Sequence, residues 1–181
     1  MSTGQSTTNS TKPTPLAEDV EAATPDAAPE RASLAGTVDT FGGTIGVGSA
    51  RTIRAPWRVS SVARARTAVV ADLEARGVSE QVIDESAIVV TELIANSLRH
   101  ANPLHDNTVR IHWTEKAGVV EIEVTDGGGV TTPKPLPRAV FASNGRGLRI
   151  VRSLAHEWGV TEKRPGVTVW ASLGGPSRRR A

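Results

Sequence analysis

Two long segments of the chain carry apolar residues at helical spacing. The first, residues 60–77, starts at a serine expected to cap the helix and ends at a glycine; its apolar positions are Val62, Ala65, Val69 and Leu73. The second, residues 79–102, also starts at a serine and ends at an Asn-Pro pair, where a helix stops. The pattern predicts two consecutive helices.

Strands are predicted where apolar and polar residues alternate. The first is "RTIRAPW", residues 51–57, and it is followed after the helices by residues 108–115 and 119–126, joined by a short turn at 116–118. A Gly- and Pro-rich stretch, residues 127–144, is predicted to be a long loop, and a helix resumes after Gly147 with "GLRIVRSLAHEW". A second hairpin, residues 157–163 and 166–173, ends the domain. This order predicts an α/β (α+β) two-layer sandwich, a mostly antiparallel mixed sheet with helices on one face.

The ends of the chain differ in composition from this core. Residues 1–32 have almost no large apolar side chains, so they cannot offset the entropy of ordering and are predicted to be disordered. Residues 33–50 contain apolar residues suited to weak strands, but their five glycines favour a flexible connector. We therefore predict a tail over residues 1–50, a domain over 51–173 and a basic tail over 174–181.

Composition narrows the class of protein. The 181 residues include no cysteine, which excludes disulfides and thiolate metal sites, and no signal or membrane-spanning run is present, so a cytoplasmic protein is expected. The net charge of +2 divides into −4 before residue 51, from two basic and six acidic residues, and +6 after it. A mildly basic domain suits an anionic ligand. Scattered basic residues and an aromatic content of 3% argue against direct nucleic-acid binding.

The second helix carries an unusual polar stripe. Glu92, Asn96 and His100 recur every four residues, so at about 100° per residue they share one side of the helix. Val89 and Leu93 fall among them, which we interpret as a partly apolar pocket wall carrying a carboxylate and an amide. The alternative is a solvated face whose apolar residues pack under a loop. No chemistry is assigned to His100, which at a helix C-terminus suits the helix dipole.

Two glycine-rich elements follow this helix. Asp126 ends a strand and precedes three glycines, a pattern in which a carboxylate can accept from an exocyclic amine while the glycines let a flat ring approach the backbone. A plain turn is the alternative. Gly145 and Gly147 stand just before a helix, where free amides can bind phosphate, although a flexible loop would have the same composition.

In this order, "TELIANSLRHA", "VTDGGG" and "NGRGLRIV" resemble the N box and the two glycine boxes of the GHKL family of ATP-binding domains, the gyrase, histidine kinase and heat-shock chaperone type. The resemblance covers about residues 51–173. The compact length is most similar to the bacterial anti-sigma-factor serine-protein kinases and their stand-alone relatives.

The resemblance implies a role for each matching residue. Asn96 would ligate Mg²⁺, a cation that prefers oxygen donors, and Glu92 would be the general base in phosphoryl transfer from ATP. Asp126 would recognise the adenine amine. Other residues implied to bind the cofactor are Gly128, Gly145, Arg146, Gly147, Leu148 and Thr168, the last through water. One departure is Val130, which replaces the last glycine of the first box and puts the mobility of the lid in question.

The function implied is that of an ATP-binding regulator, a serine/threonine protein kinase that phosphorylates or sequesters a protein partner. The partner would be a sigma factor, an antagonist protein, or both, and homodimers are common in the family. The alternative is an ATP-dependent binding regulator with the same fold and no phosphotransfer. Neither nucleic acid nor a membrane is expected as a direct partner.

Overall fold

A computed structural model of the chain describes residues 34–129, 146–163 and 166–175. Its strands are β1 (Ala50–Pro56), β2 (Thr108–Lys116), β3 (Val119–Asp126), β4 (Glu157–Lys163) and β5 (Gly166–Leu173). Its helices are α1 (Ser60–Ala75), α2 (Glu80–His100) and α3 (Arg146–Leu154). The element order is the one that the sequence predicted.

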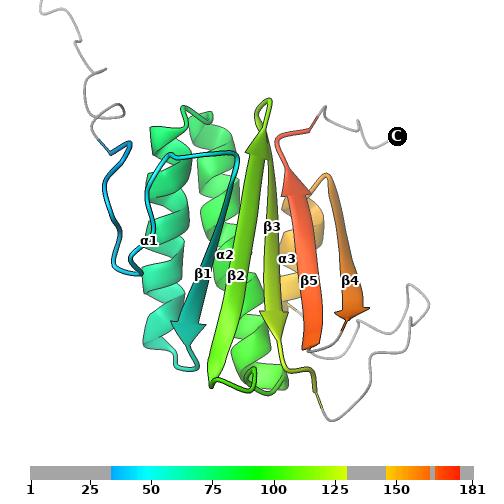
Figure 1. The fold of residues 1–181 in the computed structure, drawn as a ribbon. Helices are drawn as coiled ribbons and strands as arrows, with labels where there is room; N and C mark the ends of the chain where they lie inside the picture. Colours follow the sequence, from blue (N-terminus) through cyan, green and yellow to red (C-terminus); the bar gives the residue numbers. More distant parts are fainter. Residues whose placement is uncertain (1–33, 130–145, 164–165, 176–181) are drawn as a thin grey trace, which may run out of the picture.

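The strands form one sheet in the order β1-β2-β3-β5-β4, and every pairing between neighbours is antiparallel. Figure 1 shows the three helices on one face of this sheet, while none of the described segments crosses the other face. The predicted two-layer α/β fold is therefore confirmed. Because β5 lies between β3 and β4, the end of β3 is held in the middle of the sheet, beside α2.

The core lies between the sheet and the helices. Inward positions of the strands alternate with outward ones, and Ile53, Ile111 and Ile122 are among the buried residues. Helix α2 contacts α1, α3, β3 and β5, so more than one of its sides is apolar. Val89 and Leu93, which are 0% and 1% exposed, belong to this core. Interpreting them as a pocket wall was wrong, because the neighbouring helices widen the buried face of α2.

Two helix ends differ from the prediction. Val59, not Ser60, is the N-cap of α1 and no side chain caps it; the Ser61 hydroxyl instead donates to the Pro56 carbonyl at 2.7 Å. The third helix ends at Leu154, because the chain is already in β4 at Glu157. Helix α1 ends as predicted near Gly77, whose φ of +73° is the left-handed conformation that terminates helices.

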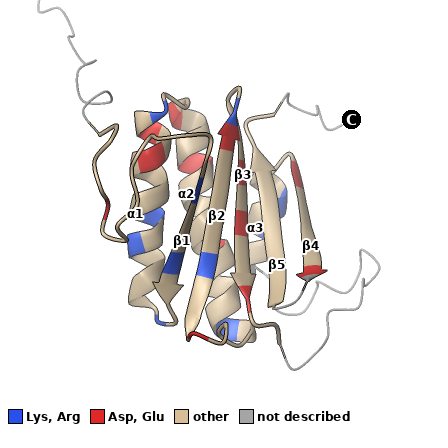
Figure 2. Ribbon diagram, in the orientation of Figure 1, with Lys and Arg blue, Asp and Glu red and all other residues tan. Residues whose placement is uncertain are grey.

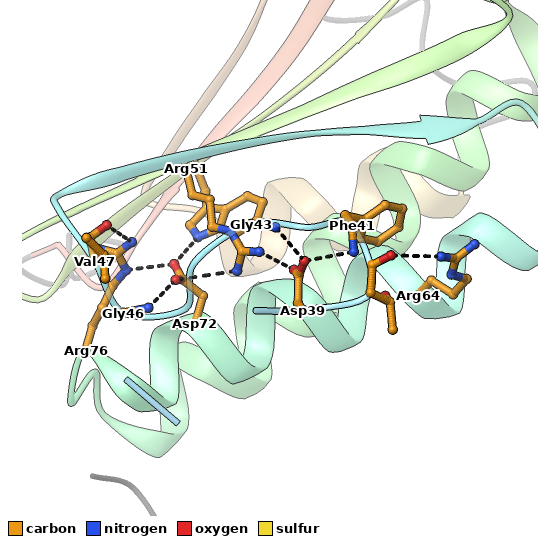
Figure 3. A network of polar contacts seen from close by, with 11 residues as sticks. Asp39, Phe41, Gly43, Gly46, Val47, Arg51, Arg64, Asp72 and Arg76 are labelled. Carbon is orange, nitrogen blue, oxygen red and sulfur yellow. Dashed lines mark hydrogen bonds and ion pairs between the residues drawn. The ribbon is translucent and has the colours of Figure 1, made fainter. Parts of the chain in front are cut away.

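Residues 34–49, which we call the N-terminal strap, differ from the expected flexible connector. The strap doubles back at an isolated bridge between Val38 and Thr44 and is held on the domain by polar contacts (Figure 3). Asp39 of the strap forms an ion pair with Arg51, a residue of β1 that points inward and is only 7% exposed. At its other end, the Gly46 amide donates to Asp72 of α1 at 2.7 Å.

Asp72 is the centre of this network. It is fully buried, at 0% exposure. Besides the Gly46 amide, its carboxylate accepts hydrogen bonds from Arg76 Nε and Trp113 Nε1, each at 2.7 Å, and it lies 3.6 Å from Arg51 Nη1. Buried charges persist only when they are paired and hydrogen-bonded. The strap adds the Gly46 amide to the donors that Arg76 and Trp113 already provide for Asp72.

Charges of both signs are interspersed over the helices and the sheet in the view of Figure 2, with acidic residues along β3 and basic residues on α1. No helix within the described residues is both long and apolar enough to cross a membrane.

Candidate nucleotide site

Helix α2 presents two polar side chains that have no partner among the described residues. Glu92 and Asn96 are both half-buried and stand one turn apart on the same side of the helix. Within the described residues, neither side chain makes a hydrogen bond or an ion pair. A carboxylate and an amide that are partly withdrawn from water and unpaired are available to a ligand.

The start of α3 lies directly against Glu92. A Cβ atom placed on Gly147 would come within 2.5 Å of Glu92 Oε2. Because glycine has no side chain, it leaves room for the Glu92 carboxylate. The fold thus brings together two segments that are 55 positions apart in the sequence. The first turn of a helix has free amides and a positive dipole end, which favour phosphate.

Two other residues predicted to bind the cofactor lie in the first turn of α3. Arg146 begins this helix, and Leu148 is half-buried against the core. Gly145, like Val130 at the first glycine box, lies outside the described residues.

Asp126 is the predicted site residue that the sheet contributes. It ends β3, is 5% exposed, and accepts a hydrogen bond on Oδ1 from the Gly128 amide at 2.9 Å. Burial raises the pKa of Asp126, and hydrogen bonds from the Ser97 hydroxyl and the Gly128 amide partly oppose that rise. A buried carboxylate with acceptor capacity left after these two bonds suits an amine of a flat ring.

The turn after Asp126 is fixed to the end of α2. The backbone and side-chain amides of Asn102 donate to the Gly128 carbonyl at 2.9 and 3.0 Å, and the Gly127 amide donates to the Asn102 carbonyl at 2.8 Å. Gly128 has φ of +80°, a conformation that favours glycine. Three hydrogen bonds therefore hold the first glycine element against the helix that carries Glu92 and Asn96.

Thr168 is not brought to this site. It pairs with Thr125 across β3 and β5, and the two hydroxyls share a hydrogen bond of 2.8 Å. Asp126 pairs instead with Val167, and neighbouring residues of a strand face opposite sides of the sheet. Thr168 therefore lies on the face away from the helices, and Val167 lies next to Gly128.

Two residues with contacts at the site were missed by sequence reasoning. Ser97, buried at 1% exposure, contacts Asp126, and Asn102 holds the glycine turn. The only signal for Ser97 was a serine at the edge of the apolar stripe of its helix. Asn102 was interpreted only as a helix terminator.

The arrangement of these elements agrees with a comparison of sequences. A family model described as a histidine kinase-like ATPase domain matches residues 55–173. The chain belongs to this family of ATPase domains. The resemblance of its three boxes to GHKL domains is thereby confirmed, whereas the roles of single residues stay predictions. No curated protein matches the chain.

Solved structures share the fold of this ATPase-family domain. One of them is the crystal structure of the RsbU and RsbW domains of Rv1364c from Mycobacterium tuberculosis, with a TM-score of 0.54 and 16% sequence identity. The match covers 70% of the present chain and 32% of that chain. At this identity the likeness concerns the fold, and the present chain spans about a third of the other.

Proposed function

We propose that this chain is an ATP-binding regulatory protein, and that it acts as a serine/threonine protein kinase of the anti-sigma-factor type. The observation that supports this proposal best is the Glu92 carboxylate beside the glycine at the start of α3, since no described residue pairs with this carboxylate. A carboxylate next to the phosphates can orient the attacking hydroxyl in phosphoryl transfer, whereas a domain that only binds protein has no use for one there.

ATP would be bound from both ends of the site, within a domain that we propose to span residues 51–173. Asp126 would accept from the adenine amine, with Gly128 beneath the base. The start of α3, with Gly147, would receive the phosphates, and Asn96 would hold Mg²⁺ through its side-chain oxygen. Asn96, which has no hydrogen-bond partner within the part of the chain that the structure describes, and Gly147 at the start of α3 fit this cofactor.

Glu92 would act on the acceptor. Its carboxylate would orient the hydroxyl of a partner serine or threonine and take up its proton, while the hydroxyl oxygen receives the γ-phosphoryl group and ADP leaves. We propose a sigma factor, an antagonist protein or both as partner, in the cytoplasm, with a homodimer as the assembly. These proposals derive from the resemblance of the three boxes to the anti-sigma-factor kinases.

The decisive experiment measures ATP binding and phosphoryl transfer separately. Proteins captured by the chain with and without ATP are identified, and transfer from γ-labelled ATP to them is followed. Asn96→Ala is expected to lose Mg²⁺-dependent ATP binding, and Glu92→Ala to keep binding but lose transfer. His100→Ala is the matched control, because His100 is exposed on the same side of α2 and its side chain makes no hydrogen bond or ion pair to another described residue.

The outcomes separate two functions. If the wild type binds ATP but transfers no label to any captured protein, the kinase proposal fails and a non-catalytic ATP-dependent regulator replaces it. If Asn96→Ala binds Mg²⁺-ATP with unchanged affinity, the metal assignment fails.

A further inference from the structure

The N-terminal strap lies on three arginines of β1 and α1, which we call the arginine surface: Arg51, Arg64 and Arg76. Figure 3 shows all three directed toward the strap. Among the described residues, Asp72 is the only carboxylate outside the strap that pairs with any of them. Three cations and one carboxylate leave two positive charges in excess beneath the strap, so this surface suits an anionic segment.

The strap meets the arginine surface with a carboxylate and an aromatic ring. Asp39 forms its ion pair with Arg51, as described above. Arg64 donates to the Thr40 carbonyl at 3.2 Å, and its guanidinium lies 4.8 Å from the centroid of the Phe41 ring, within the range of a cation–π contact. The surface therefore binds a carboxylate that precedes an aromatic ring by two residues.

The turn that carries these two groups, residues 39–43, is held by hydrogen bonds within itself. Asp39 Oδ1 accepts from the amides of Phe41 and Gly43 at 2.8 and 3.2 Å, and the Asp39 amide donates to the Gly43 carbonyl at 3.0 Å. Aspartate side chains often stabilise turns by accepting from the backbone two residues on. Because the turn orders itself, a separate chain with the same short pattern would present the two groups at a low entropic cost.

The contact between this turn and Arg51 is close but incompletely satisfied. A Cβ atom on Gly43 would overlap the Arg51 guanidinium, which lies 5.4 Å from the centroid of the Trp113 ring and is held between the strap and the core. Yet none of its nitrogens, and not Oδ2 of Asp39, has a hydrogen-bond partner among the described residues. Buried polar atoms without such partners weaken the docked state, so a competing segment can displace the strap.

We propose that the arginine surface is a docking site for a protein partner, and that the strap keeps this site closed by occupying it. The partner's segment would carry a carboxylate two residues before an aromatic ring, as the strap does. The strap is then an autoinhibitory segment that the partner must displace. It lies outside residues 55–173, which match the family, and the inference does not depend on the proposed ATP site.

The experiment asks whether the arginine surface of the full chain binds a strap supplied in trans. The probe is a fluorescent peptide with the sequence of residues 34–49, and its anisotropy reports binding. Gly43→Ala opens the chain, because the added methyl group would displace the strap from Arg51 while every charge is kept.

The opened chain is expected to bind the peptide at least about tenfold more tightly than the wild type, in which the strap competes at an effective concentration of about 1 mM. A tenfold ratio corresponds to a dissociation constant of about 0.1 mM for the opened chain. Asp39→Asn is a second opened chain, which loses the ion pair without added atoms, and urea unfolding shows whether each variant is folded.

Three controls locate the binding. Val38→Ala changes a strap residue that is 61% exposed, so this chain should bind the peptide as weakly as the wild type does. A peptide that itself carries Gly43→Ala should not bind the opened chain. Adding Arg64→Ala to the opened chain should weaken binding of the unchanged peptide about tenfold, because a hydrogen bond and a cation–π contact are lost.

Opened chains that are folded but bind the peptide no more tightly than the wild type would overturn the inference. Binding that is unaffected by Arg64→Ala would overturn it too, since the peptide would then lie elsewhere. Light scattering covers a second copy as the occupant. If the wild type is a dimer that Gly43→Ala dissociates, the strap is exchanged between two copies, and the proposal of a different protein partner is wrong.

Discussion

Replacing Asp72 by asparagine tests how much the fold depends on the buried polar network at the N-terminal strap. The substitution keeps the size of the side chain but removes its charge and turns one acceptor into a donor. Asp72 is fully buried and accepts three hydrogen bonds at 2.7 Å, from Gly46, Arg76 and Trp113. The change therefore leaves donors without an acceptor and the buried Arg51 with one partner fewer.

The magnitude follows from these contacts. Hydrogen bonds to a charged group contribute about 1.5–3 kcal/mol each, so three of them set an upper range of about 4.5–9 kcal/mol. Part of this is recovered, because Arg51 keeps Asp39 and Arg76 keeps the carbonyls of the strap. Breaking a buried charge pair by removing one partner typically costs about 3–5 kcal/mol, and we expect a loss of unfolding free energy in that range.

Urea unfolding followed by far-ultraviolet circular dichroism measures this loss. At an m-value of about 2 kcal/mol/M, the midpoint should fall by about 2 M. Asp106→Asn is the control, since Asp106 pairs with Arg54 at 2.6 Å but both side chains are partly exposed; a far smaller shift is expected. An Asp72→Asn midpoint within about 0.3 M of wild type, at an unchanged m-value, would refute the reasoning.

Three further predictions concern the site. Gly147→Ala should displace the Glu92 carboxylate, because the added carbon would come within 2.5 Å of it; phosphoryl transfer should fall while the urea midpoint stays near wild type, and unchanged transfer would contradict the contact. Burial raises the pKa of Asp126, so ATP affinity should fall as the pH is lowered through that pKa, because the protonated carboxyl accepts less well from an amine. Because the pKa of Asp126 is raised in the folded state, ionised Asp126 destabilises the fold at pH values above that pKa, and this destabilisation disappears as the pH is lowered. Measuring the ATP affinity and the free energy of unfolding over the same pH range checks both expectations. Thr168→Val should leave ATP affinity unchanged, because this hydroxyl bonds Thr125 on the far face of the sheet; a loss of affinity would restore the sequence-based role.

Local patterns predicted the elements of this fold well. Strands β2 and β3 alternate cleanly, and the turn between them places Ala117 and Gly118 at φ of +54° and +78°, as a tight hairpin requires. Val89 and Leu93 were misinterpreted because the width of a buried helix face depends on how many neighbours pack on it, and local spacing does not contain that number.

Contacts between distant residues were beyond sequence reasoning. Ser97 and Asn102 find their partners in a glycine turn more than 20 positions away, and no periodicity links the two segments. Thr168 shows a different limit. In a strand, a shift of one residue moves a side chain to the opposite face, so the resemblance to a family motif did not decide between Thr168 and Val167.

The N-terminal strap also shows that the family match and the part of the chain held in the fold begin at different residues. The family match begins at residue 55, yet the ion pair of Arg51 is made with Asp39, upstream of that point. Loss of Asp39 would leave Arg51 with Asp72 alone, 3.6 Å away, and loss of Arg51 would remove the ion pair of the buried Asp39, so we expect substitutions at the two positions to be coupled. A chain shortened to its family segment would keep Asp72 but lose the Gly46 amide that binds it. The segment that matches the family is therefore shorter than the part of the chain that these polar contacts hold together.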